Sequence, residues 1–203
     1  YTFISNFDSL NHGTIKMYKK NNDIYITSKD TIYLPINSKS IFNNCVNMEH
    51  YYFDNISTIH VEDFSYMFSK NRKLASIDLS NFDTRSATNM EYMFDAVDIL
   101  TNLDISNFDT SKVTNFRHMF AYASALTNLN LGSLNTSNAV NLECMFYHVH
   151  DLVSLDIISF DVSKVTNFSH MFDGCKGLTV IYCDGDWSSR SSSLVTDGDL
   201  DMF

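Results

Sequence analysis

The chain has 203 residues, of which 44% are hydrophobic, and this length is sufficient to bury a sizeable core. Its longest apolar runs are only a few residues, far short of the roughly 20 needed to cross a bilayer, which argues against a membrane span. The formal net charge is -10 and the Lys and Arg residues are dispersed, which argues against nucleic acid or an anionic membrane surface as a partner, since both need a basic stripe.

Residues 1–40 carry no repeat and are predicted to form a β-rich cap. The segments TIKMYKK and DIYIT, separated by Asn21 and Asn22, are typical of two strands around a polar turn. TIYL before Pro35 is typical of a third strand. Repeat arrays expose apolar faces at their ends, so a terminal cap is required there. We therefore assign residues 1–40 to an N-terminal cap.

From about residue 41 to residue 187 the chain repeats itself with a period of 26 residues. The dipeptide Met-Phe occurs at 67–68, 93–94, 119–120, 145–146 and 171–172 without any insertion between the copies. A leucine follows with the same step, at Leu74, Leu100, Leu126, Leu152 and Leu178. A period of this length indicates one supersecondary unit per repeat, stacked on its neighbours in a solenoid.

Each unit is predicted to hold one short strand and one short helix. Leu103 and Ile105 alternate with polar residues, which is typical of a strand. Val113, Phe116 and Phe120 are spaced three and four apart, which is typical of one face of a helix. The expected fold is therefore an α/β repeat solenoid of the leucine-rich-repeat type over residues 41–187, with residues 188–203 as a C-terminal cap or tail.

Two polar positions are interpreted as structural. Asp109, Thr110 and Ser111 precede the expected helix, where their side chains can cap unpaired N–H groups, so Asp109 is read as a cap and not as a catalyst. An asparagine recurs among apolar positions, and because a buried amide must be hydrogen-bonded it is predicted to join adjacent coils. This asparagine column comprises Asn89, Asn115, Asn141 and Asn167.

The segments LDISNFDTSKVTNFRHMF and MFDGCKGL resemble the BspA-like family of bacterial surface proteins, which is related to leucine-rich repeats and is also described as a domain of unknown function common in mycoplasma lipoproteins. The resemblance covers about residues 41–187 and fixes many positions of the unit. It implies an exported chain, secreted, lipid-anchored or otherwise at the bacterial cell surface, and some members of the family are adhesins. The family pattern contains no catalytic residues.

An outward-facing column of the predicted sheet is the candidate binding site. If the apolar strand residues point inward, six residues at the 26-residue step point outward together, and a sugar, a basic peptide or Ca²⁺ could use them. The alternative reading is an ordinary solvated sheet face. We call this set the outward column: Tyr52, Asp78, Asp104, Asn130, Asp156 and Tyr182.

A metal site is not expected. His118, Cys144 and His170 share one position on the expected helices, but neighbouring helices generally lie 8–10 Å apart, about twice the distance at which one ion could take a ligand from each. His148 and His150 are expected in an exposed turn. Cys45, Cys175 and Cys183 are expected as core thiols without disulfides. No cofactor is predicted.

The sequence therefore favours a protein that binds and does not catalyse. No nucleotide-binding, hydrolase or metalloprotease motif occurs, and the clear repeats show no break of the kind that a catalytic site would introduce. We expect a monomeric, adhesin-like module that binds an extracellular protein or glycan at the surface of a bacterium. The alternative is a structural spacer within a larger surface protein.

Overall fold

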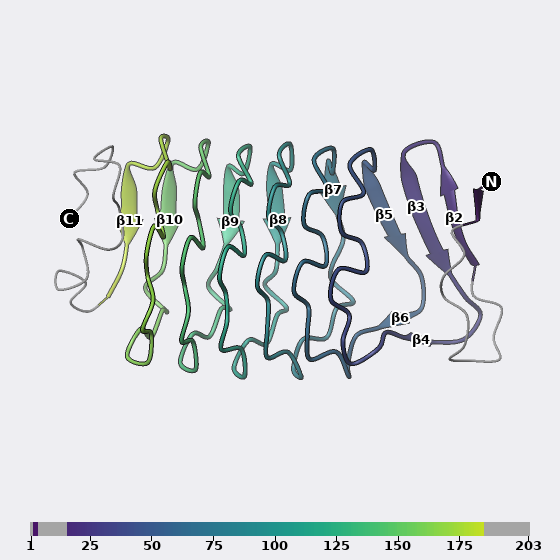
Figure 1. The fold of residues 1–203 in the computed structure, drawn as a ribbon, viewed down its shortest axis with the longest axis horizontal. Coiled ribbons are helices and arrows are strands. Elements are labelled where there is room, and N and C mark those ends of the chain that lie inside the picture. The colour runs from purple at the N-terminus through teal and green to yellow at the C-terminus, as the bar shows by residue number, and fades with distance from the viewer. Residues whose placement is uncertain (1, 4–15, 185–203) are drawn as a thin grey trace.

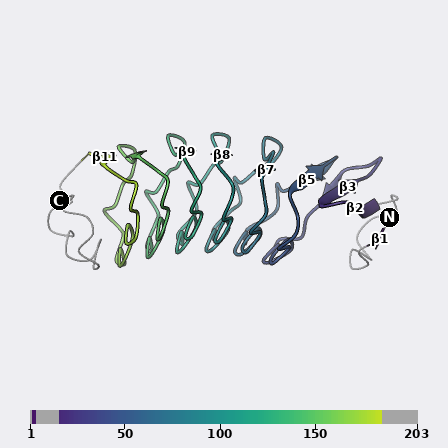
Figure 2. The same ribbon diagram turned by 90° about the horizontal axis from the view of Figure 1, so that it is seen from above.

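The computed structural model describes residues 2–3 and 16–184 and shows a β-solenoid. Its coils lie side by side along one long axis, from β2 and β3 at one end to β11 at the other (Figure 1). Figure 2 shows the same coils from above, as successive loops of similar outline. The leucine-rich-repeat-like solenoid predicted from the 26-residue period is thus confirmed as an architecture.

The strands are short, and most of them follow the predicted positions. Residues of the expected cap form β1 (Thr2–Phe3), β2 (Lys16–Lys20), β3 (Asp23–Thr27) and β4 (Ile32–Tyr33). The first repeats supply β5 (His50–Phe53), β6 (Ile56–Ser57) and β7 (Ser76–Ile77). One strand of each later coil follows: β8 (Asn102–Asp104), β9 (Asn128–Asn130), β10 (Ser154–Asp156) and β11 (Val180–Tyr182).

Parallel stacking begins earlier than the repeat in the sequence. The β2–β3 pair is an antiparallel hairpin around Asn21 and Asn22, as predicted. However, β3 pairs with β5 in parallel, with Tyr25 opposite Tyr52, and an isolated parallel bridge joins Asn37 to Asp63. Residues from β3 onward therefore take part in parallel stacking, which begins before residue 40.

The predicted short helix of each coil is wrong, because no helix occurs among the described residues. In the coil of Phe116, alternate backbone N–H groups point to the next coil: Phe116 donates to Asn141 at 3.0 Å and His118 donates to Glu143 at 2.9 Å. The N–H of Met119, directly after His118, instead closes a turn onto the carbonyl of Phe116 at 3.0 Å. An α-helix would instead pair each N–H with the carbonyl four residues before it. We call this alternating segment the turn ladder.

Left-handed backbone conformations explain why the turn ladder does not become helical. His118 and Tyr122 have φ angles of 55° and 57°, and the corresponding residues of the other coils do the same. A right-handed helix does not tolerate such a residue in every turn. The inward positions were nevertheless predicted correctly, since Val113, Phe116 and Phe120 are all fully buried. The 26-residue period places these positions without specifying the backbone between them.

Three side-chain turns recur in each coil between Asp63 and Ser163. In one coil, carboxylate or amide oxygens of Asp104, Asp109 and Asn115 each accept a hydrogen bond from the backbone N–H two residues later, at 2.9, 3.0 and 3.1 Å. Asp and Asn favour such turns because their short side chains reach this N–H. Asp109 therefore satisfies a backbone donor, as predicted, but in a turn and not at a helix start.

The asparagine column joins coils mainly through its backbone. Isolated parallel bridges connect Asn89 to Asn115 and Asn115 to Asn141. The Asn115 amide is half-buried and not fully buried, and its Nδ2 reaches Glu91 of the preceding coil at 3.3 Å. The predicted link between coils is thus present, although burial of the amide is not its cause.

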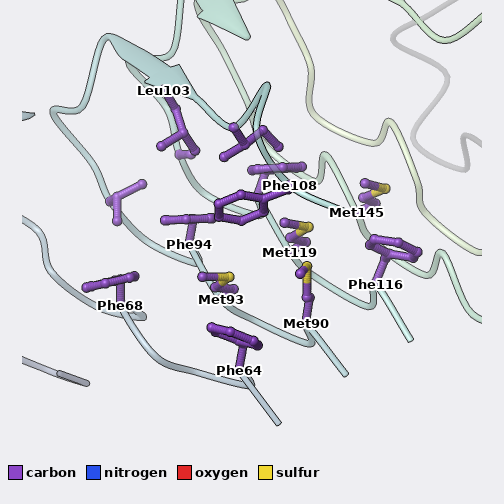
Figure 3. Packing of buried hydrophobic residues seen from close by; sticks show 14 of the residues in the cluster. Phe64, Phe68, Met90, Met93, Phe94, Leu103, Phe108, Phe116, Met119 and Met145 are labelled. Atoms are coloured by element: carbon purple, nitrogen blue, oxygen red, sulfur yellow. The ribbon is translucent and has the colours of Figure 1, made fainter. Parts of the chain in front are cut away.

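A stack of phenylalanine rings runs through the core. Phe94 and Phe120 are parallel within 2°, with ring centroids 6.1 Å apart, and Phe120 stacks on Phe146 at 5.6 Å. Figure 3 shows Phe68 and Phe94 in successive coils, with Met93, Met119 and Phe108 packed among the neighbouring rings. Each coil contributes one ring to a stack that no coil could bury alone. The stack comprises Phe42, Phe68, Phe94, Phe120, Phe146 and Phe172.

Candidate binding face

The strand register places the outward column on one exposed face. Asp104 lies opposite Asn130 in the β8–β9 pair, and Asp156 lies opposite Tyr182 in the β10–β11 pair. Tyr52 and Tyr182 are 45% and 53% exposed, and the four residues between them in the column are also exposed. The predicted residues therefore lie at neighbouring register positions with their side chains accessible, which a binding face requires.

The carboxylates of the outward column also have a structural role. One oxygen of Asp78 accepts the N–H of Ser80 at 2.9 Å, and Asn130 makes the same bond to Gly132 at 3.1 Å. These backbone hydrogen bonds hold the pKa values of Asp78 and Asp104 below the ordinary value for the residue type. The side chains are thus fixed in direction, ionised at neutral pH, and use one oxygen within the coil.

Stacked tyrosines extend the outward column toward β2. The ring of Tyr25 lies 4.6 Å from Tyr52 and 5.1 Å from Tyr18, with interplanar angles of 10° and 8°. Sequence reasoning identified Tyr52 but missed Tyr18 and Tyr25. The signal was available, since a hairpin around Asn21 and Asn22 brings the central residues of KMYKK and DIYIT opposite each other. We call Tyr18, Tyr25 and Tyr52 the tyrosine stack.

A surface hollow lies where the tyrosine stack meets the first acidic residue of the outward column. Tyr25, Tyr52, Asp78 and Asn81 line it, together with Asp54, and its volume is about 290 Å³. It combines aromatic faces with a carboxylate and an amide. Such a mixture of apolar surface and a few oriented polar groups is typical of sites that recognise small ligands or extended chains.

The turn ladder forms a second face with its own aromatic and histidine residues. Tyr66 stacks on Tyr92 with centroids 4.6 Å apart, and Tyr92 stacks on His118 at 4.4 Å. The coil spacing on this face is therefore about half of the 8–10 Å between packed helices. The helix spacing on which a shared metal site at His118 and Cys144 was not expected is therefore absent from this face.

An arginine bridges two acidic residues on the same face. Arg117 pairs with Glu91 and with Glu143, each at 3.2 Å, and its guanidinium lies 5.1 Å from the ring centroid of Tyr92. The hydrogen bond with Arg117 is the main reason that the pKa of Glu143 is lowered. Further along, Tyr122 stacks on His148 at 5.3 Å, and Nδ1 of His148 lies 3.1 Å from Nε2 of His150.

The cysteines divide between core and half-buried positions. Cys175 is buried, as predicted for a core thiol, whereas Cys45 and Cys183 are half-buried. The fourth, Cys144, is buried on the turn-ladder side. All four are free thiols.

Comparisons with known proteins identify a family. The model of a mycoplasma protein family of unknown function, DUF285, matches residues 16–102, 36–153 and 96–193. No curated protein matches the chain. No helix that could span a membrane occurs in residues 2–3 or 16–184.

Two solved structures of leucine-rich repeat proteins are similar in outline. The protein from T. pallidum is 16% identical, with a TM-score of 0.44 over 91% of this chain and 88% of that one. The protein from Bacteroides ovatus ATCC 8483 is 12% identical, with a TM-score of 0.25 over 94% of this chain and 82% of that one. The family match alone covers most of the chain, and the chain therefore belongs to the DUF285 family of BspA-like, leucine-rich-repeat-related proteins.

Proposed function

We propose that the chain is a non-enzymatic binding module that engages an extracellular protein or glycan through the outward column and the tyrosine stack. The observation that carries the proposal is the hollow between Tyr25, Tyr52 and Asp78, where aromatic faces adjoin an oriented carboxylate. Tyrosine rings contribute much contact area at little entropic cost, and they are enriched where proteins recognise partners.

The acidic residues favour a ligand rich in hydroxyl groups or positive charge. Three carboxylates of the outward column are held in fixed directions by their own backbone N–H bonds. A ligand that meets them loses little side-chain freedom, because the protein has already ordered these groups. The net charge of -10 adds an attraction for basic partners that salt would weaken. We place this activity at the bacterial cell surface or outside the cell, as in adhesins.

The test uses a glycan array together with a panel of matrix proteins and mucins, probed with the purified chain. For any ligand found, Tyr52→Ala is expected to weaken binding about tenfold or more, because an exposed aromatic anchor is lost. The matched control is Tyr122→Ala, since Tyr122 is similarly exposed, at 43%, but lies on the turn-ladder face. No retention of any ligand at micromolar concentration, or equal loss in both variants, would count against the proposal.

A structural spacer is the second candidate, and the continuous hydrogen-bonded stacking of the coils supports it. Coil-to-coil backbone bonds of 2.7–3.1 Å recur along the turn ladder, for example from Tyr122 to Tyr147 and from Phe120 to Met145. Such a ladder resists bending between adjacent coils. A spacer requires no ligand. Variants of the outward column and the tyrosine stack that leave cell attachment, and the activity of a larger surface protein containing the chain, unchanged would therefore favour the spacer.

A further inference from the structure

Three side chains with different ligand chemistry meet on the turn-ladder face. His118 comes from one coil, and Glu143 and Cys144 come from the next, where Cys144 occupies the position equivalent to His118. One ligand atom of each residue lies within 4.8 Å of the other two. The backbone causes this proximity, because His118 N–H donates to the carbonyl of Glu143 at 2.9 Å and both His118 and Cys144 have φ angles of 55°.

The imidazole of His118 has an unused nitrogen. Its Nδ1 is buried and has no hydrogen-bond partner among the described residues, whereas buried ring nitrogens normally have one. Its ring is held by stacking on Tyr92 at 4.4 Å. Burial, with a smaller effect from Arg117, lowers the pKa of His118 to about 4, so the ring is neutral at pH 7. A neutral imidazole is the form that binds metal ions.

Glu143 is oriented by partners of the kind that surround metal-bound carboxylates. Arg117 engages both carboxylate oxygens, with Nη2 donating to Oε1 and Nε lying near Oε2, each at 3.2 Å, and Asn167 Nδ2 donates to Oε2 at 2.9 Å. A carboxylate has about four lone-pair sites, so Oε1, which accepts a single hydrogen bond from Arg117, keeps a further lone pair for a cation. Arg117 also pairs with Glu91 at 3.2 Å, so one positive charge is shared by two negative charges and does not repel a cation outright.

Cys144 completes the set with sulfur. Its side chain is buried, and burial raises the pKa of the thiol to about 11, so the group is protonated until a metal ion displaces the proton. Ligands bound tetrahedrally to zinc at about 2.0–2.3 Å lie about 3.4–3.8 Å from one another. Side-chain rotations that move the ligand atoms by roughly 1 Å therefore suffice to close the three side chains around an ion.

We propose that His118, Glu143 and Cys144 form a binding site for Zn²⁺ or a closely similar transition-metal ion. Imidazole, thiolate and carboxylate together suit zinc, and three protein ligands leave a fourth position for water or a partner's side chain. The site does not depend on the binding proposed for the outward column.

Cobalt(II) is the probe for this site, because its absorption reports both geometry and sulfur ligation. The purified chain is titrated with Co²⁺, and a thiolate-to-cobalt charge-transfer band that saturates at one ion per chain and disappears on adding Zn²⁺ is expected. Cys144→Ser is expected to abolish the band. His118→Tyr and Glu143→Gln are expected to weaken affinity about a hundredfold or more. Cys45→Ser is the matched control and keeps the wild-type titration.

The variants are chosen so that loss of folding does not confuse the result. His118→Tyr repeats the Tyr66 and Tyr92 of the earlier coils, so the stack of rings accepts it. In the wild type, Zn²⁺ is expected to protect Cys144 selectively from alkylation, which mass spectrometry can map without any mutation. Absence of saturable binding, a band that survives in Cys144→Ser, or binding lost only on changing His148 and His150 would overturn the proposal.

Discussion

The hydroxyl of Thr110 donates a hydrogen bond to the carbonyl of Asn135 in the next coil at 3.0 Å, and the N–H of Asn135 donates back to the same hydroxyl at 2.8 Å. Thr110 is only 1% exposed. One side chain thus satisfies both backbone groups of a residue 25 positions later. The same donation to a carbonyl of the next coil recurs at Thr58, Thr84 and Thr136.

Thr110→Val is therefore expected to destabilise the fold although the two side chains have the same shape. The carbonyl and N–H of Asn135 would both lose the buried hydroxyl as their partner, and the loss of these two part-buried hydrogen bonds is expected to cost about 1–3 kcal/mol in the free energy of unfolding. Thr114→Val is the control, because Thr114 is exposed and its hydroxyl makes only a long bond of 3.4 Å. Chemical denaturation measures both, and equal midpoints would refute the role of this column.

Gly174→Ala is expected to destabilise the last described coils. Gly174 has a φ angle of 72°, and a left-handed conformation costs a non-glycine residue about 1–2 kcal/mol. An added Cβ would also lie 2.7 Å from Nδ1 of His148, so that ring would have to move. A lower melting temperature in a circular-dichroism melt is the expected result.

Two controls separate the causes of that loss. Gly132→Ala places its Cβ 3.3 Å from the side-chain oxygen of Asn130, with no left-handed φ, and is expected to change stability by less than about 0.5 kcal/mol. Gly174→Ala in a His148→Ala background keeps the backbone strain and removes the ring. If the double variant has the same melting temperature as the His148→Ala single variant, backbone strain at residue 174 is not the cause of the loss.

Acid is expected to weaken the turns of the coils. Four aspartates have pKa values lowered chiefly by a backbone N–H bond, from an ordinary value of 3.8: Asp78, Asp104, Asp109 and Asp161. Below pH 3.8 these carboxylates become protonated in the unfolded chain, while in the folded chain they stay ionised to a lower pH. The stability that these groups contribute is therefore complete above pH 3.8 and is lost as pH falls through the lower folded-state pKa values.

Replacing the four aspartates by asparagine tests this origin of acid sensitivity. Asparagine keeps the accepting oxygen, as Asn130 shows by its 3.1 Å bond to Gly132, but does not titrate. The quadruple variant is expected to fold and to lose less melting temperature than the wild type between pH 7 and about pH 3. An identical loss in both proteins would place the acid-sensitive groups elsewhere.

The period of the sequence predicted which residues meet, but not the path of the backbone between them. The spacing of Phe116 and Phe120 fits a helix face, and it also fits a ladder of turns with a left-handed residue between the two. Propensity for a left-handed φ at residues such as His118 and Tyr122 is too weak to read from side-chain type. The inward positions were therefore right and the helix was wrong.

That one error propagated into the reading of sites. The helix spacing assumed in the prediction placed His118 and Cys144 too far apart to share an ion. In the structure, the stacking of coils brings ligand atoms of His118, Glu143 and Cys144 together. The register of the outward column was predicted correctly, because strand register depends only on the 26-residue step. The turn bonds of its aspartates were missed, since an outward acidic side chain looks the same whether or not it binds its own backbone.

The ring stack of the core provides the largest expected effect of a single substitution. Phe120 is fully buried between Phe94 at 6.1 Å and Phe146 at 5.6 Å, so Phe120→Ala would leave a cavity between two coils. The expected cost is about 3–5 kcal/mol in the free energy of unfolding. Val153→Ala, at a position 59% exposed, is the control and is expected to stay within about 0.5 kcal/mol of the wild type.

The cavity left by Phe120→Ala is also expected to let the coils on its two sides unfold separately, because each coil is stable only against its neighbours. Hydrogen exchange resolves this unfolding coil by coil. Uniform exchange at the wild-type rate on both sides of Phe120 would contradict this account of the array.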